Sequence, residues 1–121
     1  MIKIGLIEDS KYEYQKWQFL AENSEIPCEI KWFETPEIFL ASSERYDLIV
    51  VDRTFEMDGS TIDLVTSGFL QKIKDHFDGP VVYSSDAPLF KDERELFAKS
   101  LSGKKIKSIP NLLKSLGIVP E

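Results

Sequence analysis

Four short apolar segments, each followed by polar side chains, constrain this chain more than any other feature of its sequence. Residues 1–7 lead into Glu8 and Asp9, residues 47–51 into Asp52, residues 80–83 into Ser84 and Ser85, and the weaker segment 105–107 into Ser108. If these segments are parallel strands of one sheet, their carboxyl ends lie along one edge. That edge then holds three carboxylates, a hydroxyl and a lysine.

The segments between these strands carry helical signals. Ser10 and Glu13 have the spacing of a capping box, and Thr35-Pro36 combines an N-cap with proline at the first helical position. Helices are predicted to begin at these two caps and at Ser60, and to cover residues 88–101 and 110–116, while residues 28–32 alternate like a half-buried strand. This order predicts an α/β protein: a five-stranded parallel sheet in a flavodoxin-like, doubly wound (βα)5 three-layer sandwich.

Size and composition restrict the classes of function. A chain of 121 residues is predicted to form a single domain over 1–121, and its net charge of −6 argues against a nucleic-acid backbone as ligand. It has no apolar run of the ~18 residues that a membrane helix needs and no signal-peptide pattern, so we expect neither membrane insertion nor secretion. The lone Cys28 cannot form an internal disulfide, and the cytoplasm is the predicted compartment.

The three carboxylates Glu8, Asp9 and Asp52 predict a metal site. At roughly 5 Å and an effective dielectric constant near 20, each ionised pair repels by about 3 kcal/mol. Such a group either takes up a proton or holds a cation. Carboxylate oxygens without histidine or thiolate favour Mg²⁺, which commonly completes its coordination with water and phosphate oxygens.

Taken together, these residues resemble a receiver domain of bacterial response regulators, nearest in size to the single-domain chemotaxis type. The resemblance spans essentially the whole chain and rests on the ordered set of Glu8-Asp9, Asp52, a hydroxyl after the fourth strand and a lysine after the fifth. Asp58-Gly59, expected to open the third helix, also matches a common feature of that family.

The resemblance implies a Mg²⁺-dependent phosphorylation switch. Asp52 would be the phosphoacceptor, and Glu8, Asp9, Asp52 and the main-chain carbonyl of Thr54 would hold Mg²⁺. Ser84 or Ser85 would contact the phosphoryl group, and Lys107 would pair with it. The implied partners are a sensor histidine kinase or a histidine phosphotransfer protein and an output protein; beyond phosphotransfer to itself and its reversal, the chain would not be an enzyme.

Three alternatives stay open at this stage. Counting from Pro80 favours Ser85 as the switch hydroxyl, whereas Ser84 leaves a small residue in the following position. Lys105 rivals Lys107, whose next residue is Ser108 where the family has proline, and Lys104 stands where the family has an aromatic residue. These departures motivate the alternative of a degenerate receiver that acts as a phosphorylation-independent protein-interaction module.

Enzymes of similar topology fit the sequence less well. A haloacid-dehalogenase-type phosphatase needs a second aspartate two residues after its nucleophile, where this chain has Thr54. A flavodoxin needs a phosphate-binding loop after the first strand, where Glu8 and Asp9 would repel a phosphate.

Overall fold

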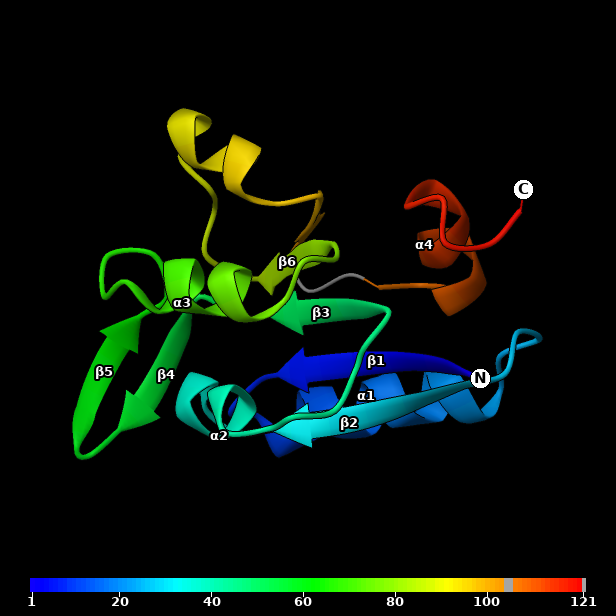
Figure 1. Cartoon of the computed structure of the whole chain (residues 1–121), viewed down its shortest axis with the longest axis horizontal. Helices are drawn as coiled ribbons and strands as arrows, with labels where there is room; N and C mark the ends of the chain where they lie inside the picture. Colours follow the sequence, from blue (N-terminus) through cyan, green and yellow to red (C-terminus); the bar gives the residue numbers. More distant parts are fainter. Residues whose placement is uncertain (104–105, 121) are drawn as a thin grey trace.

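A five-stranded parallel sheet forms the centre of the computed structural model, which describes residues 1–103 and 106–120 (Figure 1). The strand order is β2-β1-β3-β6-β7, and every neighbouring pair is parallel. The strands are β1 (Ile2–Ile7), β2 (Cys28–Phe33), β3 (Leu48–Val51), β6 (Val81–Ser85) and β7 (Lys99–Ser102). The predicted fold class is confirmed.

Both faces of this sheet are covered, which makes three layers. Along β3, Leu48 and Val50 face α1 (Lys11–Glu22) and α4 (Ile109–Ser115), whereas Ile49 and Val51 face α2 (Pro36–Leu40) and α3 (Phe69–His76). All four β3 residues are fully buried, as a uniformly apolar strand between two layers should be. No helix among the described residues is long and apolar enough to cross a membrane.

The predicted helix starts at Ser10 and Thr35 are confirmed. The Ser10 hydroxyl oxygen accepts a hydrogen bond from the backbone N–H of Glu13, and that of Thr35 accepts one from Ile38, both at 3.3 Å. Each hydroxyl satisfies a backbone donor that the first helical turn leaves without a partner. The two caps set where α1 and α2 leave the carboxyl ends of β1 and β2.

The helix predicted from Ser60 is wrong in its first half. Residues 54–63 form an antiparallel hairpin of β4 (Thr54–Met57) and β5 (Ser60–Asp63), and α3 begins only at Phe69. Asp58 (φ 52°) and Gly59 (φ 77°) make a two-residue turn with both residues in the left-handed region, the geometry that twisted hairpins favour. Phe55 and Met57 are buried against the core, so the hairpin rests on the carboxyl edge of the sheet (Figure 1).

The predicted helix over 88–101 and the predicted strand over 105–107 are also wrong. Only a 3₁₀ helix, η1 (Lys91–Leu96), forms in the first segment, and the fifth strand is β7, which pairs with β6 from Val82↔Lys99 onward. Ile106 and Lys107 lie in no strand, and Lys105 is outside the described residues. Pairing supplies partners for the exposed edge of β6, such as the bond from Ala98 N–H to the Val81 carbonyl at 2.9 Å, and a helix would leave that edge open.

Candidate metal centre

The two central strands bring Glu8, Asp9 and Asp52 to the same point of the carboxyl edge. β1 and β3 are paired in register up to Ile7↔Val51, and the backbone N–H of Asp52 donates to the Ile7 carbonyl at 3.1 Å. The chain runs from β1 outward to β2 on one side and from β3 to β6 and β7 on the other. The carboxylates therefore stand where the strand order reverses, which is where open α/β sheets bind ligands.

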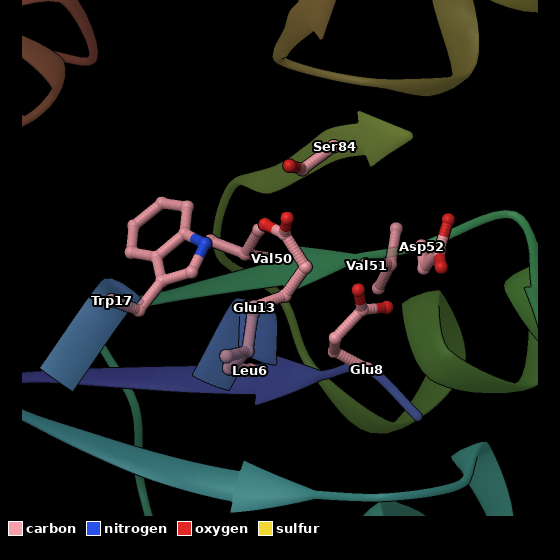
Figure 2. Close-up of a pocket in the computed structure, with 8 residues that line it drawn as sticks. All are labelled: Leu6, Glu8, Glu13, Trp17, Val50, Val51, Asp52 and Ser84. Atoms are coloured by element: carbon pink, nitrogen blue, oxygen red, sulfur yellow. The ribbon is translucent and has the colours of Figure 1, made fainter. Parts of the chain in front are cut away.

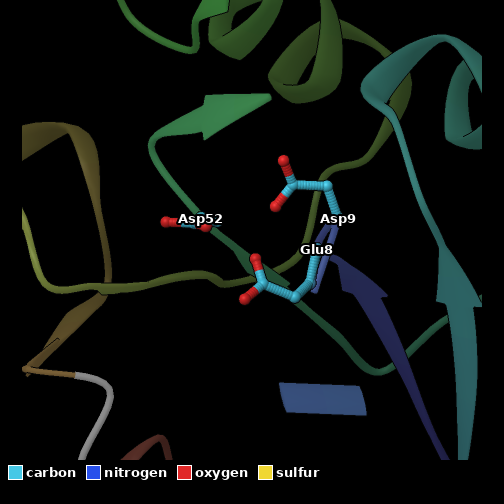
Figure 3. Close-up of side chains that lie close together, drawn as sticks. All are labelled: Glu8, Asp9 and Asp52. Carbon is cyan, nitrogen blue, oxygen red and sulfur yellow. The ribbon is translucent and has the colours of Figure 1, made fainter. Parts of the chain in front are cut away.

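One carboxylate oxygen from each of these three residues lies within 4.8 Å of the others (Figure 3). Glu8 and Asp52 are buried, with 2% and 7% of their surface exposed, and Asp9 is exposed. Burial makes the mutual repulsion of these charges stronger than it would be in water. The group holds carboxylate oxygens and neither histidine nor cysteine, so its donor set fits a hard divalent cation such as Mg²⁺.

Hydrogen bonds hold the three acidic residues, at the carboxylates of Asp52 and Asp9 and at the main chain of Glu8. Arg53 N–H donates to Asp52 Oδ1 at 2.7 Å, and Glu56 N–H in the hairpin lies 3.4 Å from Asp9 Oδ2. The indole N–H of Trp32 donates to the main-chain oxygen of Glu8 at 2.5 Å. The cluster is thus held from β2, from Arg53 just after β3, and from the hairpin.

A small pocket beside the cluster contains a residue that the sequence analysis did not assign to the site. Glu13, on the first turn of α1, lines this pocket together with Glu8, Asp52, Ser84 and Trp17 (Figure 2). Its backbone N–H is capped by Ser10 as predicted, but its carboxylate forms an ion pair of 2.7 Å with Lys16. An acidic residue in the first turn of a helix that starts at the carboxyl edge is the signal that would have placed Glu13 here.

Ser84 and Ser85, between which the sequence left the choice open, have different surroundings. Both are buried, each with 5% of its surface exposed. Ser84 lines the pocket that contains Glu8 and Asp52, whereas the Ser85 hydroxyl oxygen accepts a hydrogen bond of 3.2 Å from Ala87 N–H. Successive residues of a strand point to opposite faces, which explains the difference.

The structure does not bring Lys107 to the carboxylates. Its exposed side chain lines a surface pocket with Asn23 and Ser24, in the loop between α1 and β2. That loop lies at the amino ends of the strands, the opposite edge of the sheet. Lys105, the rival assignment, is outside the described residues. Thr54 begins β4, two residues after Asp52.

Arg53, which the sequence analysis did not assign to the site, is a buried cation that binds two carboxylates. Its guanidinium donates two hydrogen bonds to Glu93, at 2.8 and 2.9 Å, and one to Asp63 Oδ2 at 2.9 Å.

These contacts shift the pKa values of all three groups. The bonds to Glu93 raise the pKa of Arg53 above its ordinary value, against the opposing effect of desolvation. The same bonds from Arg53, aided by Phe90 N–H, lower the pKa of Glu93. Burial raises the pKa of Asp63, but hydrogen bonds from Thr66 N–H, Arg53 and Val65 N–H outweigh it and the net shift is downward.

Comparison with known proteins identifies this architecture. No model of a protein family matches the sequence, and the comparison with curated proteins finds no match. Solved structures do match over nearly the whole chain. A two-component response regulator from Clostridium difficile has a TM-score of 0.77 at 21% identity, covering 98% of this chain and 97% of that one.

Two further matches were solved with ions or a modification. The Mn²⁺-bound form of response regulator Rcp1 has a TM-score of 0.67 at 25% identity and covers 98% of this chain and 91% of its own. A response regulator from Burkholderia pseudomallei, with a phosphorylated aspartic acid, a calcium ion and citrate, has a TM-score of 0.69 at 12% identity. The match covers 96% of this chain and 66% of that one. The structural neighbours of this chain are thus receiver domains, and it has their CheY-like fold.

Proposed function

We propose that this protein is a Mg²⁺-dependent phosphoacceptor of a two-component or phosphorelay system and that Asp52 receives the phosphoryl group. The observation that carries the proposal is the cluster of Glu8, Asp9 and Asp52, with ligand oxygens within 4.8 Å, at the strand-order reversal of a receiver fold. Three clustered carboxylates, two of them buried, cost stability through repulsion, and binding a cation that in turn binds phosphate offsets that cost.

The proposed chemistry is nucleophilic attack by a carboxylate. An Asp52 Oδ atom forms a bond to the phosphorus of the donor while the bond from phosphorus to the leaving group breaks, and the leaving group departs with the electron pair. The product is an acyl phosphate on Asp52. Glu8, Asp9, Asp52 and the main-chain carbonyl of Thr54 would hold Mg²⁺, which when bound would neutralise charge on the phosphoryl oxygens.

The surrounding residues have supporting roles in this proposal. Arg53 N–H holds Asp52 Oδ1 in place, and the Ser84 hydroxyl, in the same pocket as Asp52, donates to a phosphoryl oxygen. Lys107 has no part, because its side chain lies at the other edge of the sheet. The phosphodonor is a phosphohistidine of a sensor kinase or of a phosphotransfer protein, and the modified protein acts by binding an output protein.

The position of Lys107 favours a second candidate function, a receiver fold that binds partner proteins without being phosphorylated. In that case Lys107, expected from the sequence to pair with the phosphoryl group, would belong to a surface that binds a partner protein. Phosphorylation by a small donor separates the two candidates.

Intact-mass spectrometry after incubation with acetyl phosphate tests the proposal, with Mg²⁺ and with EDTA. We expect one phosphoryl adduct that requires Mg²⁺ and is absent from Asp52→Asn, with acetate as the leaving group. Glu95→Gln, an exposed change outside the pocket, should be modified like the wild type. A folded wild-type protein that binds Mg²⁺ and acquires no adduct would instead support the interaction module.

A further inference from the structure

Arg53 connects the residue next to it, Asp52, with two segments far away in the sequence. Its guanidinium is bound bidentately by Glu93 in η1 and singly by Asp63 at the end of β5. The side chain of Arg53 is 8% exposed and that of Glu93 11% exposed. Paired charges in such surroundings interact strongly and demand defined geometry.

The backbone of Arg53 is engaged as well. Its N–H donates to Asp52 Oδ1 at 2.7 Å, and its carbonyl accepts from Leu64 N–H at 2.6 Å. Any displacement of the Asp52 carboxylate therefore acts on the same residue that holds Glu93 and Asp63.

Glu93 also binds the backbone of Phe90, whose aromatic side chain is exposed. Its Oε1 accepts hydrogen bonds from Arg53 Nη1, at 2.8 Å, and from Phe90 N–H, at 2.9 Å. The Phe90 ring lies 5.7 Å from the guanidinium carbon and is 67% exposed. The start of η1 is thus anchored through the ion pair between Arg53 and Glu93.

We propose that Arg53, Asp63 and Glu93 form a latch that couples the state of Asp52 to the hairpin and to residues 86–97. The proposal rests on the function proposed above. Once Asp52 Oδ atoms coordinate a cation or carry a phosphoryl group, Oδ1 is a poorer acceptor for Arg53 N–H, and Arg53 moves. Two parallel hydrogen bonds tolerate little movement, so the contact with Glu93 weakens and Phe90 is released.

Reciprocity gives the latch a measurable consequence. We call the latch open when the contact between Arg53 and Glu93 is broken. If a ligand at Asp52 favours the open latch, then a mutation that opens the latch must increase the affinity of the protein for that ligand. Glu93→Gln removes the ion pair but keeps an oxygen for Phe90 N–H, and it should therefore lower the dissociation constant for Mg²⁺. If the substitution acted only through long-range electrostatics, it would raise this dissociation constant, because the loss of a negative charge weakens the attraction for a cation.

Titration calorimetry with Mg²⁺ on the full chain tests the latch without any phosphoryl transfer. We expect Glu93→Gln to bind Mg²⁺ about fivefold more tightly than the wild type, within the usual range of coupling between sites. Asp63→Asn, which keeps Oδ1 for Val65 and Thr66 N–H, should shift affinity in the same direction and serves if Glu93→Gln does not fold. The control Glu95→Gln removes one charge from the same 3₁₀ helix and should bind no more tightly than the wild type.

Hydrogen–deuterium exchange supplies a second readout. In the wild type, saturating Mg²⁺ should speed exchange in residues 86–97, and in Glu93→Gln that segment should exchange fast with or without Mg²⁺. Equal Mg²⁺ affinities of Glu93→Gln and Glu95→Gln, or an unchanged exchange rate of residues 86–97 in the Mg²⁺-bound wild type, would overturn the latch. Failure of the proposed function shows itself separately, as absence of the phosphoryl adduct from a protein that binds Mg²⁺.

Discussion

Arg53 and Glu93, 40 residues apart in the sequence, are joined by two parallel hydrogen bonds of 2.8 and 2.9 Å in the interior of the protein. Neither residue belongs to the carboxylate cluster, yet Arg53 directly follows the candidate phosphoacceptor. This pair anchors η1 to the end of β3, and its contribution to stability depends on the charge of Glu93.

Glu93→Gln should destabilise the protein in a pH-dependent way. At pH 7 we expect a loss of about 3 kcal/mol, roughly 10 °C in Tm, because removing one partner leaves a buried charge less well compensated. The pKa of Glu93 in the folded protein is below its ordinary value of 4.5, so its contribution is fully present above that pH. It is lost as the pH falls through the folded-state pKa. Urea unfolding of both proteins at a series of pH values checks this, and a difference that stays constant down to pH 3 would contradict it.

Asp9→Asn should stabilise the metal-free protein and remove most of its response to Mg²⁺. Relief of repulsion from Glu8 and Asp52 is worth about 1 kcal/mol, since the exposed position of Asp9 screens its charge. Wild-type Tm should rise with Mg²⁺ and fall on addition of EDTA, because a ligand that binds only the folded state stabilises it. Thermal unfolding with and without Mg²⁺ measures both effects. Asp92→Asn, exposed and outside the cluster, is the control that should respond to Mg²⁺ like the wild type.

Ser84→Ala should affect the rate of phosphorylation, whereas Ser85→Ala should affect the stability of the fold. Ser84 lines the pocket with Asp52, so its loss should slow formation of the acyl phosphate by about 10²-fold, the lower end for a hydrogen-bond donor to charge that develops in the transition state. Ser85 holds Ala87 N–H, so its loss should cost about 1 kcal/mol of stability and leave the rate of modification nearly unchanged. Time-resolved intact-mass spectrometry and urea unfolding measure the two effects. The opposite pattern would assign the switch hydroxyl to Ser85.

Gly59→Ala and Ser60→Ala should distinguish the hairpin from the helix expected at this point. In the hairpin Gly59 has φ 77°, where a residue with a Cβ atom costs about 1–2 kcal/mol. Ser60 is exposed and caps no helix, so its replacement by alanine should be nearly neutral. If Ser60 instead began a helix, Ser60→Ala would cost about 1 kcal/mol and Gly59→Ala would cost little. Urea unfolding of both variants decides between these outcomes.

The errors in the predicted secondary structure arose in segments whose apolar residues have helical spacing but which form other structures. The spacing of Ile62, Leu64 and Val65 suits a helical face, but Thr54–Met57 alternates between polar and apolar residues and runs into Asp58-Gly59, a strong hairpin signal. Residues 88–101 likewise have helical spacing, yet Phe90 is exposed and Lys99–Ser102 pairs with β6. In the first segment the hairpin signal was present in the sequence and prevailed over the helical spacing. In the second segment the outcome depended on pairing with β6, which the segment's own residues do not encode.

The sequence by itself determined four of the five parallel strands, the starts of α1 and α2, and the meeting of Glu8, Asp9 and Asp52. Strand periodicity, caps and strand ends are local features, and the geometry of parallel sheets alone brings strand ends to one edge. Only the tertiary structure decided that Ser84 and Glu13 share the pocket with Asp52, that Lys107 lies at the other edge, and that Arg53 binds Glu93. Those relationships depend on the path of the chain between elements, since contacts between residues more than 30 positions apart leave no periodic trace in the sequence.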